Sequence, residues 1–306
     1  MRRVTYFAGM MANAVALASM SAAQAPAGNA TSAAKLAESG QCRAALPLLR
    51  VAVTHATDPA LIKRLGVDGV HCAMSLGDAD GAQDFVRVLK KHFPHDPEVL
   101  YITVHVFSDL SLRASQELSA TAHDSYQMHE LNAEAFEAQG KPEEAIAEYR
   151  EVLKKEPALQ GMHYRIGRLL LSGTNRDAVK EEARREFEQE LKIDPSSAAA
   201  EYVLGELARQ DQQTDMAVAH FEKATKLDRG FTDAFIGLGR SLIEGGRGAD
   251  AIVPLEAAAK LQPDNPAAHF YLATAYQRSG RQEEASREFA KQKQAAEKMS
   301  QSQKAK

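Results

Sequence analysis

The chain has 306 residues, of which 44% are hydrophobic and 25% are charged, a composition typical of folded globular proteins rather than disordered ones. Lysine and arginine number 37, aspartate and glutamate number 41, and the formal net charge of −4 argues against a nucleic-acid binder, which needs a strong positive field. No apolar stretch of about 18 residues follows the first few dozen residues, which excludes a membrane protein with several spans.

The first 27 residues have the layout of a secretory signal peptide. Arg2 and Arg3 precede a weakly apolar stretch, residues 4–20, and small residues dominate from there to residue 27. The small-x-small patterns at 21–23 and 25–27 predict cleavage after Ala23 or Ala27. We therefore expect an exported protein, periplasmic or secreted, without a membrane span once the signal peptide is removed.

Residues 32–125 carry a weak helical pattern that we interpret as three degenerate helical hairpins. Each of the first two has a turn glycine, Gly40 or Gly77, followed by apolar residues at the spacing of one helix face. The second hairpin is expected to close at Pro94, because a proline ring without an N–H cannot continue a helix. Residues 95–125 are expected to form a shortened, unusual hairpin.

Residues 126–299 contain a clear internal repeat of about 34 residues. Three residue types recur: an alanine, a large side chain four residues later, and a residue with little or no side chain in the preceding helix, 12 residues before four of the alanines and 16 before Ala183. The alanines are Ala145, Ala183, Ala217, Ala251 and Ala285; the large residues are Tyr149, Phe187, Phe221, Leu255 and Phe289; the small ones are Ala133, Gly167, Gly205, Gly239 and Ala273. Such a pattern predicts two antiparallel helices in close contact, with the small residue of the first helix against the alanine of the second.

This pattern resembles the tetratricopeptide repeat family, whose unit is a helix, a turn and a helix. Residues 232–265 carry the resemblance most completely, with Leu238-Gly239, the turn glycines Gly245 and Gly246, and the terminating Pro263. The resemblance implies an all-α, right-handed solenoid of about eight antiparallel hairpins, five well formed in residues 126–299 and three degenerate in 32–125. A charged tail, residues 300–306, is expected to follow.

Two local departures from the repeat are expected to change its helices. Residues 174–177 are an insertion of four residues, most simply a lengthened turn between two helices. Pro254 lies where a second helix is expected, so it should remove one backbone hydrogen bond and kink that helix.

The two cysteines, Cys42 and Cys72, fall in the first two hairpins implied by the resemblance. Cys42 begins the second helix of the first hairpin, and Cys72 lies near the end of the following helix, so in an antiparallel stack they face each other. In an oxidising compartment such thiols form disulfides. Two separate buried thiols are the alternative, since cysteine is also a common small core residue.

The first helices of such a solenoid line its concave surface, so equivalent positions form columns that a partner would meet. Three neighbouring columns contain an apolar row beside residues of alternating charge, and together they form a candidate partner-binding groove. Its residues are Tyr164, Arg168, Leu171, Tyr202, Glu206, Arg209, Ile236, Arg240, Ile243 and Phe270. An apolar stripe beside alternating charges suits a helix or extended peptide of a protein partner. Alternatively, the glutamates and arginines pair with one another and the aromatic residues belong partly to the core.

Catalytic and metal-binding motifs are not recognised in the sequence. His129-Glu130 begins like a zinc-protease helix, but Ala133 stands where the second histidine is required. His92 and His95 have a ligand-like spacing, but Pro94 interrupts the helix that would place both rings on one side. No nucleophile elbow, P-loop or dinucleotide-binding glycine motif is present, so no catalytic residue, metal or cofactor is assigned.

Two functions remain open at this point. The first is a non-catalytic protein–protein interaction scaffold or assembly factor outside the cytoplasm, binding a peptide or helix in the concave groove. The alternative is a metal-binding or small-ligand-binding protein, or an unrecognised enzyme, that uses the distorted, histidine-rich region 63–129.

Overall fold

The structure is a computed structural model that describes residues 25–173 and 176–304. These residues form fifteen helices and no strand, which confirms the all-α class. The helices group into two compact units, one ending at Ala120 and the other beginning at Thr121.

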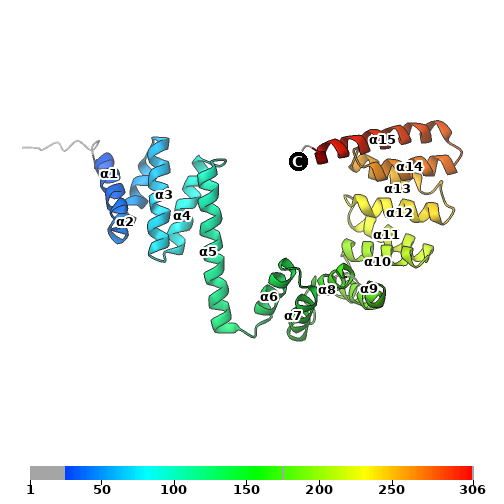
Figure 1. Ribbon diagram of the computed structural model, residues 1–306, viewed down its shortest axis with the longest axis horizontal. Coiled ribbons are helices and arrows are strands. Elements are labelled where there is room, and N and C mark those ends of the chain that lie inside the picture. Colours follow the sequence, from blue (N-terminus) through cyan, green and yellow to red (C-terminus); the bar gives the residue numbers. More distant parts are fainter. Residues whose placement is uncertain (1–24, 174–175, 305–306) are drawn as a thin grey trace, which may run out of the picture. The chain divides into compact units, whose positions relative to one another are not determined.

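The N-terminal unit consists of two hairpins and one long helix, shown in blue to cyan-green in Figure 1. Its helices are α1 (Ala25–Glu38), α2 (Cys42–His55), α3 (Pro59–Ser75), α4 (Ala79–His92) and α5 (Pro97–Ala122), the last of which reaches the boundary between the units. Its core is built from all five helices and includes Leu49, Leu65, Phe85 and Val106.

The C-terminal unit consists of five consecutive hairpins that follow an arc (Figure 1). Its helices are α6 (Tyr126–Ala138), α7 (Pro142–Lys155), α8 (Met162–Ser172), α9 (Arg176–Ile193), α10 (Ala198–Gln210), α11 (Thr214–Leu227), α12 (Thr232–Glu244), α13 (Ile252–Leu261), α14 (Pro266–Arg278) and α15 (Gln282–Lys304). The five repeats predicted for residues 126–299 are therefore confirmed as helix pairs.

The repeat residues lie where the two helices of each hairpin meet, but the closest contact differs from the one expected. All five repeat alanines are buried. A Cβ atom built on Gly167 would lie 2.8 Å from the Phe187 ring, and one on Gly205 would lie 2.9 Å from the Phe221 ring. The bulky residue of the second helix, and not its alanine, is thus the nearest neighbour of the glycine.

Gly239 makes the same kind of contact, and its replacement tests how tightly the hairpins are packed. An alanine Cβ at this position would lie 2.6 Å from Cδ2 of Leu255. We expect Gly239→Ala to lower the free energy of unfolding by about 1–3 kcal/mol, because overpacking forces the neighbouring side chain to shift. Alanine is otherwise the better helix former, so a loss of stability reports the clash.

The matched control is Gly173→Ala, since the nearest atom to its added Cβ would be a backbone oxygen 3.8 Å away and its φ of −71° suits any residue. Thermal unfolding followed by circular dichroism compares the two variants. Combining Gly239→Ala with Leu255→Ala should cost less than the sum of the single changes. Equal melting temperatures for the wild type and Gly239→Ala would contradict the tight contact.

The expectation of a third N-terminal hairpin in residues 95–125 is wrong. The segment forms a single helix, α5, of 26 residues. After Pro97 this helix contains neither glycine nor proline, so no residue favours the turn that a hairpin needs. The described residues therefore form seven hairpins and one long helix instead of eight hairpins.

The insertion at residues 174–177 and Pro254 also have effects on their helices that differ from those expected. Helix α9 has 18 residues, whereas α7 and α11 have 14 each, so the insertion extends the helix from Arg176 instead of only lengthening the turn. Helix α13 begins at Ile252, which places Pro254 in its first turn. First-turn N–H groups have no partner within the helix, so this proline removes no helical hydrogen bond, and the expected cause of a kink is absent.

Two of the expected boundaries fall near the ends of the described residues. Most of the expected signal peptide lies outside the described residues, and Ala25, Pro26 and Ala27 belong to helix α1. At the other end, helix α15 continues to Lys304, through most of the segment expected as a charged tail.

Candidate functional site

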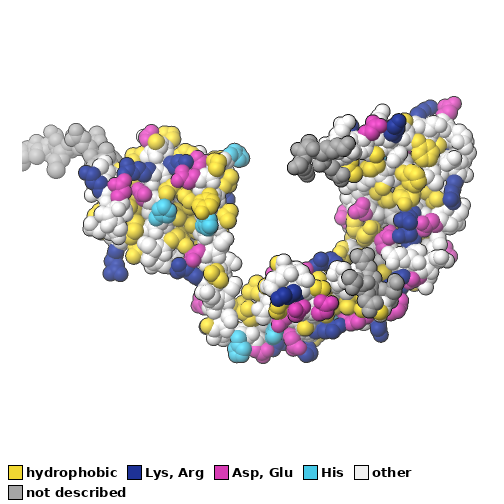
Figure 2. Space-filling view, viewed as in Figure 1, with side chains coloured by type: hydrophobic (Ala, Val, Ile, Leu, Met, Phe, Trp, Pro, Cys, Tyr) yellow, Lys and Arg dark blue, Asp and Glu magenta, His cyan; other side chains and the backbone are white. Residues whose placement is uncertain are grey.

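The apolar stripe predicted from the sequence runs along the first helices of four consecutive hairpins, α8, α10, α12 and α14. Tyr164, Tyr202 and Ile236 are half-buried, and Phe270 is 45% exposed. Figure 2 shows hydrophobic side chains gathered on the face of the C-terminal unit that is in view, over helices α12 to α15. The stripe is therefore accessible, most of all at Phe270.

Tyr164 and Tyr202 also pack against the core from their side of the hairpins. The Tyr164 ring lies 5.6 Å from that of Phe187, and the Tyr202 ring lies 5.8 Å from that of Phe221, measured between centroids. Tyr202 also contacts Phe231, with 4.9 Å between ring centroids. Both tyrosines can offer a partner only part of the ring.

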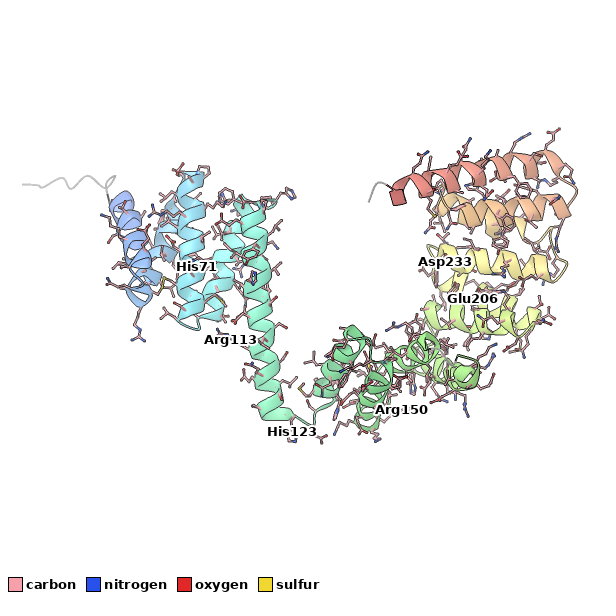
Figure 3. All side chains as sticks on the ribbon, viewed as in Figure 1. His71, Arg113, His123, Arg150, Glu206 and Asp233 are labelled. Carbon is pink, nitrogen blue, oxygen red and sulfur yellow. A yellow bond between two sulfur atoms is a disulfide. The ribbon has the colours of Figure 1, made fainter. Side chains whose placement is uncertain are left out.

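The electrostatic surroundings of Tyr202 keep its phenol neutral. Burial raises the pKa of Tyr202 to about 12, and the nearby carboxylates of Glu206 and Asp233 add to the effect. These two acidic residues lie on helices α10 and α12 and are labelled in Figure 3. A neutral phenol can both donate and accept a hydrogen bond at neutral pH.

The charged residues beside the stripe pair with one another. Arg209 lies 2.8 Å from Glu206 and 3.7 Å from Glu244, and Arg240 lies 2.9 Å from the same Glu244. The guanidinium of Arg240 also lies 5.7 Å from the centre of the Tyr271 ring. This arrangement corresponds to the structural alternative considered for the alternating charges.

Arg168, on the first helix α8, is also paired with an acidic residue. It forms an ion pair with Glu137 of the preceding hairpin, and Arg165 lies 3.2 Å from Glu134. Arg168 is nevertheless exposed. A charged group of a partner can compete for it at little cost, because exposed ion pairs are weak.

Leu171, Arg209 and Ile243 occupy equivalent positions on successive first helices, but this column contributes less to an accessible surface than its spacing suggests. Ile243 is 5% exposed and packs in the core with Leu272 and Tyr276, so it cannot line a groove and its assignment as a contact residue is wrong. Leu171 is partly buried against the cluster that contains Phe187 and Leu204. Ile243 and Leu171 thus pack against the next hairpin instead of facing a partner.

A set of histidine–glutamate pairs was missed by the sequence analysis. They join the two helices of four of the five C-terminal hairpins, and each brings a histidine Nδ1 within 2.6 Å of a glutamate Oε2. The signal that could have found them is that both partners occupy equivalent repeat positions.

The N-terminal unit holds the two cysteines in one disulfide. Cys42 at the start of α2 is bonded to Cys72 near the end of α3, with a Cα–Cα distance of 4.8 Å. The bond joins two consecutive hairpins across their contact.

The alternative function depends on how possible metal ligands lie in residues 63–129. No group of three or more histidine, cysteine or acidic side chains that could hold a metal ion occurs in the part of the chain that the structure describes. Among residues 25–173 and 176–304, no helix has both the length and the apolar character needed to cross a bilayer.

Comparisons with known proteins address the repeat architecture. Residues 121–178, 180–230 and 236–297 match the family described as tetratricopeptide repeat, which together is more than half of the chain. No curated protein matches the chain.

Several solved structures share the fold at low sequence identity. The crystal structure of MamA protein is 22% identical with a TM-score of 0.51, covering 58% of this chain and 96% of that one. MamA 41-end from Desulfovibrio magneticus RS-1 is 20% identical, with a TM-score of 0.51 and coverages of 57% and 97%. YrrB, described as a TPR protein with an unusual peptide-binding site, is 19% identical, with a TM-score of 0.51 and coverages of 60% and 92%.

The repeat glycines and alanines, the five C-terminal hairpins and the extent of the family match agree with one another. The chain belongs to the tetratricopeptide repeat family.

Proposed function

We propose that the chain is a non-catalytic protein-interaction scaffold or assembly factor that acts outside the cytoplasm. Its C-terminal unit would bind a peptide or a helix of a partner protein along the first helices. The observation that carries this proposal is the accessible apolar stripe formed by Tyr164, Tyr202, Ile236 and Phe270 on four consecutive hairpins.

The spacing of the stripe suits an elongated ligand. Equivalent positions on successive first helices form a row, and a helix or extended segment can place one apolar side chain against each of several hairpins. The exposed Arg168 and the half-buried Arg240 flank the row, where they can fix the direction of a partner that carries acidic residues. The peptide-binding site described for YrrB supports the use of such a fold for peptide binding.

The proposal is tested by removing the most exposed ring of the stripe. We expect Phe270→Ala to weaken partner binding by about 10-fold or more, because large aromatic side chains that are buried against a partner often contribute more than 1 kcal/mol. The measurement is the recovery of partner proteins on the immobilised full chain, identified and quantified by mass spectrometry.

Val253→Ala is the matched control for this experiment. Val253 is 73% exposed on α13, a second helix, so its truncation removes apolar surface outside the stripe. Both variants should show the helical circular-dichroism signal of the wild type. If Phe270→Ala retains every partner that the wild type binds, or if Val253→Ala loses them equally, the stripe is not the binding surface.

The extracytoplasmic location rests on the signal-peptide pattern and is tested at the N-terminus of the mature protein. Cleavage after Ala23 or Ala27 leaves Gln24 or Gly28 as the first residue. N-terminal sequencing of the protein from its native cell decides between these ends. A mature chain that still begins with the first residues of the sequence and stays in the cytoplasm would contradict export.

A further inference from the structure

The histidine–glutamate pairs of the C-terminal unit occupy one repeat position on each helix. The pairs are His129–Glu148, His163–Glu186, Glu201–His220 and His269–Glu288. The partners are 19 residues apart, or 23 in the hairpin that carries the four-residue insertion. In the remaining hairpin the same two positions hold Phe235 and Pro254, which cannot form such a pair.

One pair has its two residues exchanged between the helices. In α10 and α11 the glutamate, Glu201, comes from the first helix and the histidine, His220, from the second. The two facing positions of a hairpin therefore accept the pair whichever helix carries the histidine. Each pair links the helices of its own hairpin, so it acts on hairpin closure.

Both ring nitrogens of His269 lie close to an oxygen that can accept a hydrogen bond. His269 is 4% exposed; Nδ1 lies 2.6 Å from Glu288 Oε2 and Nε2 lies 2.9 Å from the backbone oxygen of Pro263. Both neighbours can accept hydrogen bonds, so an imidazolium cation, with a proton on each ring nitrogen, satisfies both contacts. The charged groups nearby are Lys291 on α15, 2.7 Å from Glu288, and Glu256 and Lys260 on α13.

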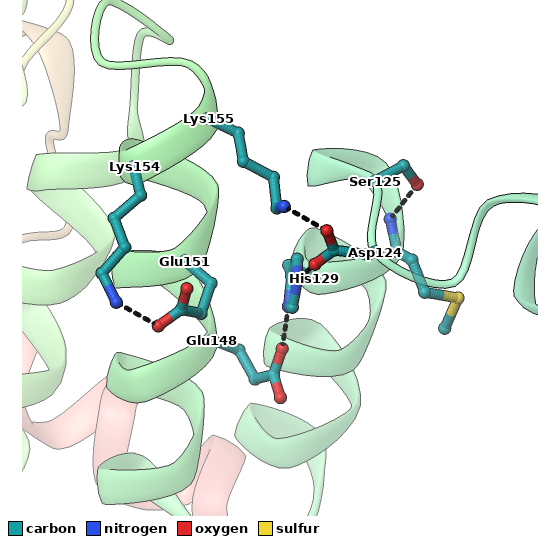
Figure 4. A network of polar contacts seen from close by, with 8 residues as sticks. Asp124, Ser125, His129, Glu148, Glu151, Lys154 and Lys155 are labelled. Carbon is teal, nitrogen blue, oxygen red and sulfur yellow. Dashed lines mark hydrogen bonds and ion pairs between the residues drawn. The ribbon is translucent and has the colours of Figure 1, made fainter.

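His129 has the same two-sided arrangement in the first hairpin of the unit, shown in Figure 4. Its Nδ1 lies 2.6 Å from Glu148 and its Nε2 lies 3.3 Å from Oδ1 of Asp124. Hydrogen bonding to Glu148 raises the pKa of His129 above its ordinary value, against a smaller opposing effect of burial. Lys155, 2.8 Å from Asp124, and Glu151 are the other charged groups on α7 that face this histidine.

His163 and His220 differ from these two in the contacts of the second ring nitrogen. Their Nδ1 atoms face Glu186 and Glu201, but the described residues supply no hydrogen-bond acceptor at Nε2. Lys223 shares Glu201 at 3.2 Å. A neutral imidazole with its proton on Nδ1 satisfies such a pair, so these two hairpins do not need the cation.

We propose that His129 and His269 are proton-dependent latches that hold hairpins α6–α7 and α14–α15 closed while their imidazoles are charged. These hairpins are the first and the last of the C-terminal unit, so within the unit each stacks on a neighbour from one side only. Stability of a repeat array comes mainly from stacking between neighbours, and an end hairpin depends more on its own internal contacts.

The direction of the pH dependence follows from the pKa shifts. Because the pKa of His129 is raised, its stabilising effect is complete below about pH 6.5 and is lost as the pH rises through the raised value. Burial opposes ionisation of Glu288, but the hydrogen bonds from Lys291 and His269 together outweigh it and lower the pKa, so its contribution is lost only as the pH falls through a value below 4.5. Both stabilising effects are therefore complete between about pH 4.5 and 6.5, and the His129 latch opens as the pH rises through the raised pKa of its imidazole.

The test compares thermal unfolding of the full chain at pH 6 and pH 8.5. We expect the wild type to melt at a lower temperature at pH 8.5, by about 2–4 °C for each latch that loses its proton. The double variant His129→Gln with His269→Gln should lose most of this difference between the two pH values. Because each protein is compared with itself, any pH-independent loss of stability cancels.

Two histidine variants serve as controls. His163→Gln removes a pair with a one-sided histidine, and His95→Gln removes an exposed histidine of the N-terminal unit; both should keep most of the wild-type difference. Equal melting temperatures of the wild type at the two pH values, or an unchanged difference in the double variant, would overturn the proposal.

A measurement on the wild type keeps the proposal testable if the double variant does not fold. The ring ¹⁵N shifts of His129 and His269 at pH 6 should report two protonated nitrogens, and as the pH is raised His129 should keep both protons to a pH above the ordinary histidine value of 6.5. A single protonated nitrogen in both rings at pH 6 would rule out the latches.

Discussion

Phe221→Ala is expected to lower the free energy of unfolding of the C-terminal unit by about 3–5 kcal/mol, the range found for truncating a buried phenylalanine. The Phe221 ring is fully buried and lies between two glycines on different first helices. A Cβ on Gly205 would lie 2.9 Å from the ring and one on Gly237 would lie 2.6 Å from it. Neither glycine can fill the space that the ring leaves, so the cavity persists.

Met216→Ala is the control for this experiment, because Met216 lies on the same helix, α11, and is 49% exposed. We expect its effect to stay within about 0.5 kcal/mol. Denaturant unfolding followed by circular dichroism measures both variants. A loss below about 1 kcal/mol for Phe221→Ala would show that the hairpins do not pack around this ring.

Removing the disulfide is expected to destabilise the N-terminal unit by about 3–4 kcal/mol in the chain-entropy treatment. The bond between Cys42 and Cys72 closes a loop with a sequence separation of 30 and joins two hairpins. Replacing both cysteines by alanine removes the bond without leaving a free thiol. The measurement is limited proteolysis of the full chain, with cleavage in residues 39–78 quantified by mass spectrometry.

The wild type under reducing conditions should show the same increase in cleavage, and the alanine variant should not respond to the reductant. Non-reducing peptide mapping of the protein purified from its native cell provides an independent check. Two free thiols in that protein, or equal cleavage of the oxidised wild type and the variant, would contradict a stabilising disulfide.

The repeat architecture could be predicted because packing imposes a strict pattern on the sequence. Gly167, Gly205 and Gly239 recur because a bulky side chain of the second helix lies against each of them. Few other residues fit such a contact, so the spacing is visible in one sequence.

Features set by several residues together were predicted less well. Pro254 is harmless because its helix starts at Ile252, and the residue at which a helix begins is only weakly encoded in the sequence. Ile243 was assigned to the groove from its column alone, but contacts with the next hairpin bury it. The histidine–glutamate pairs require two positions to be compared across repeats, in either order.

The most direct test of the proposed interaction surface is site-specific photocrosslinking in the native cell. A photoreactive phenylalanine analogue at Phe270, within the stripe, should form an adduct with a partner protein, because this ring is exposed on a first helix. The same analogue at Val253, on a second helix, should form none. Adducts at Val253 equal to those at Phe270, or none at Phe270, would contradict binding along the first helices.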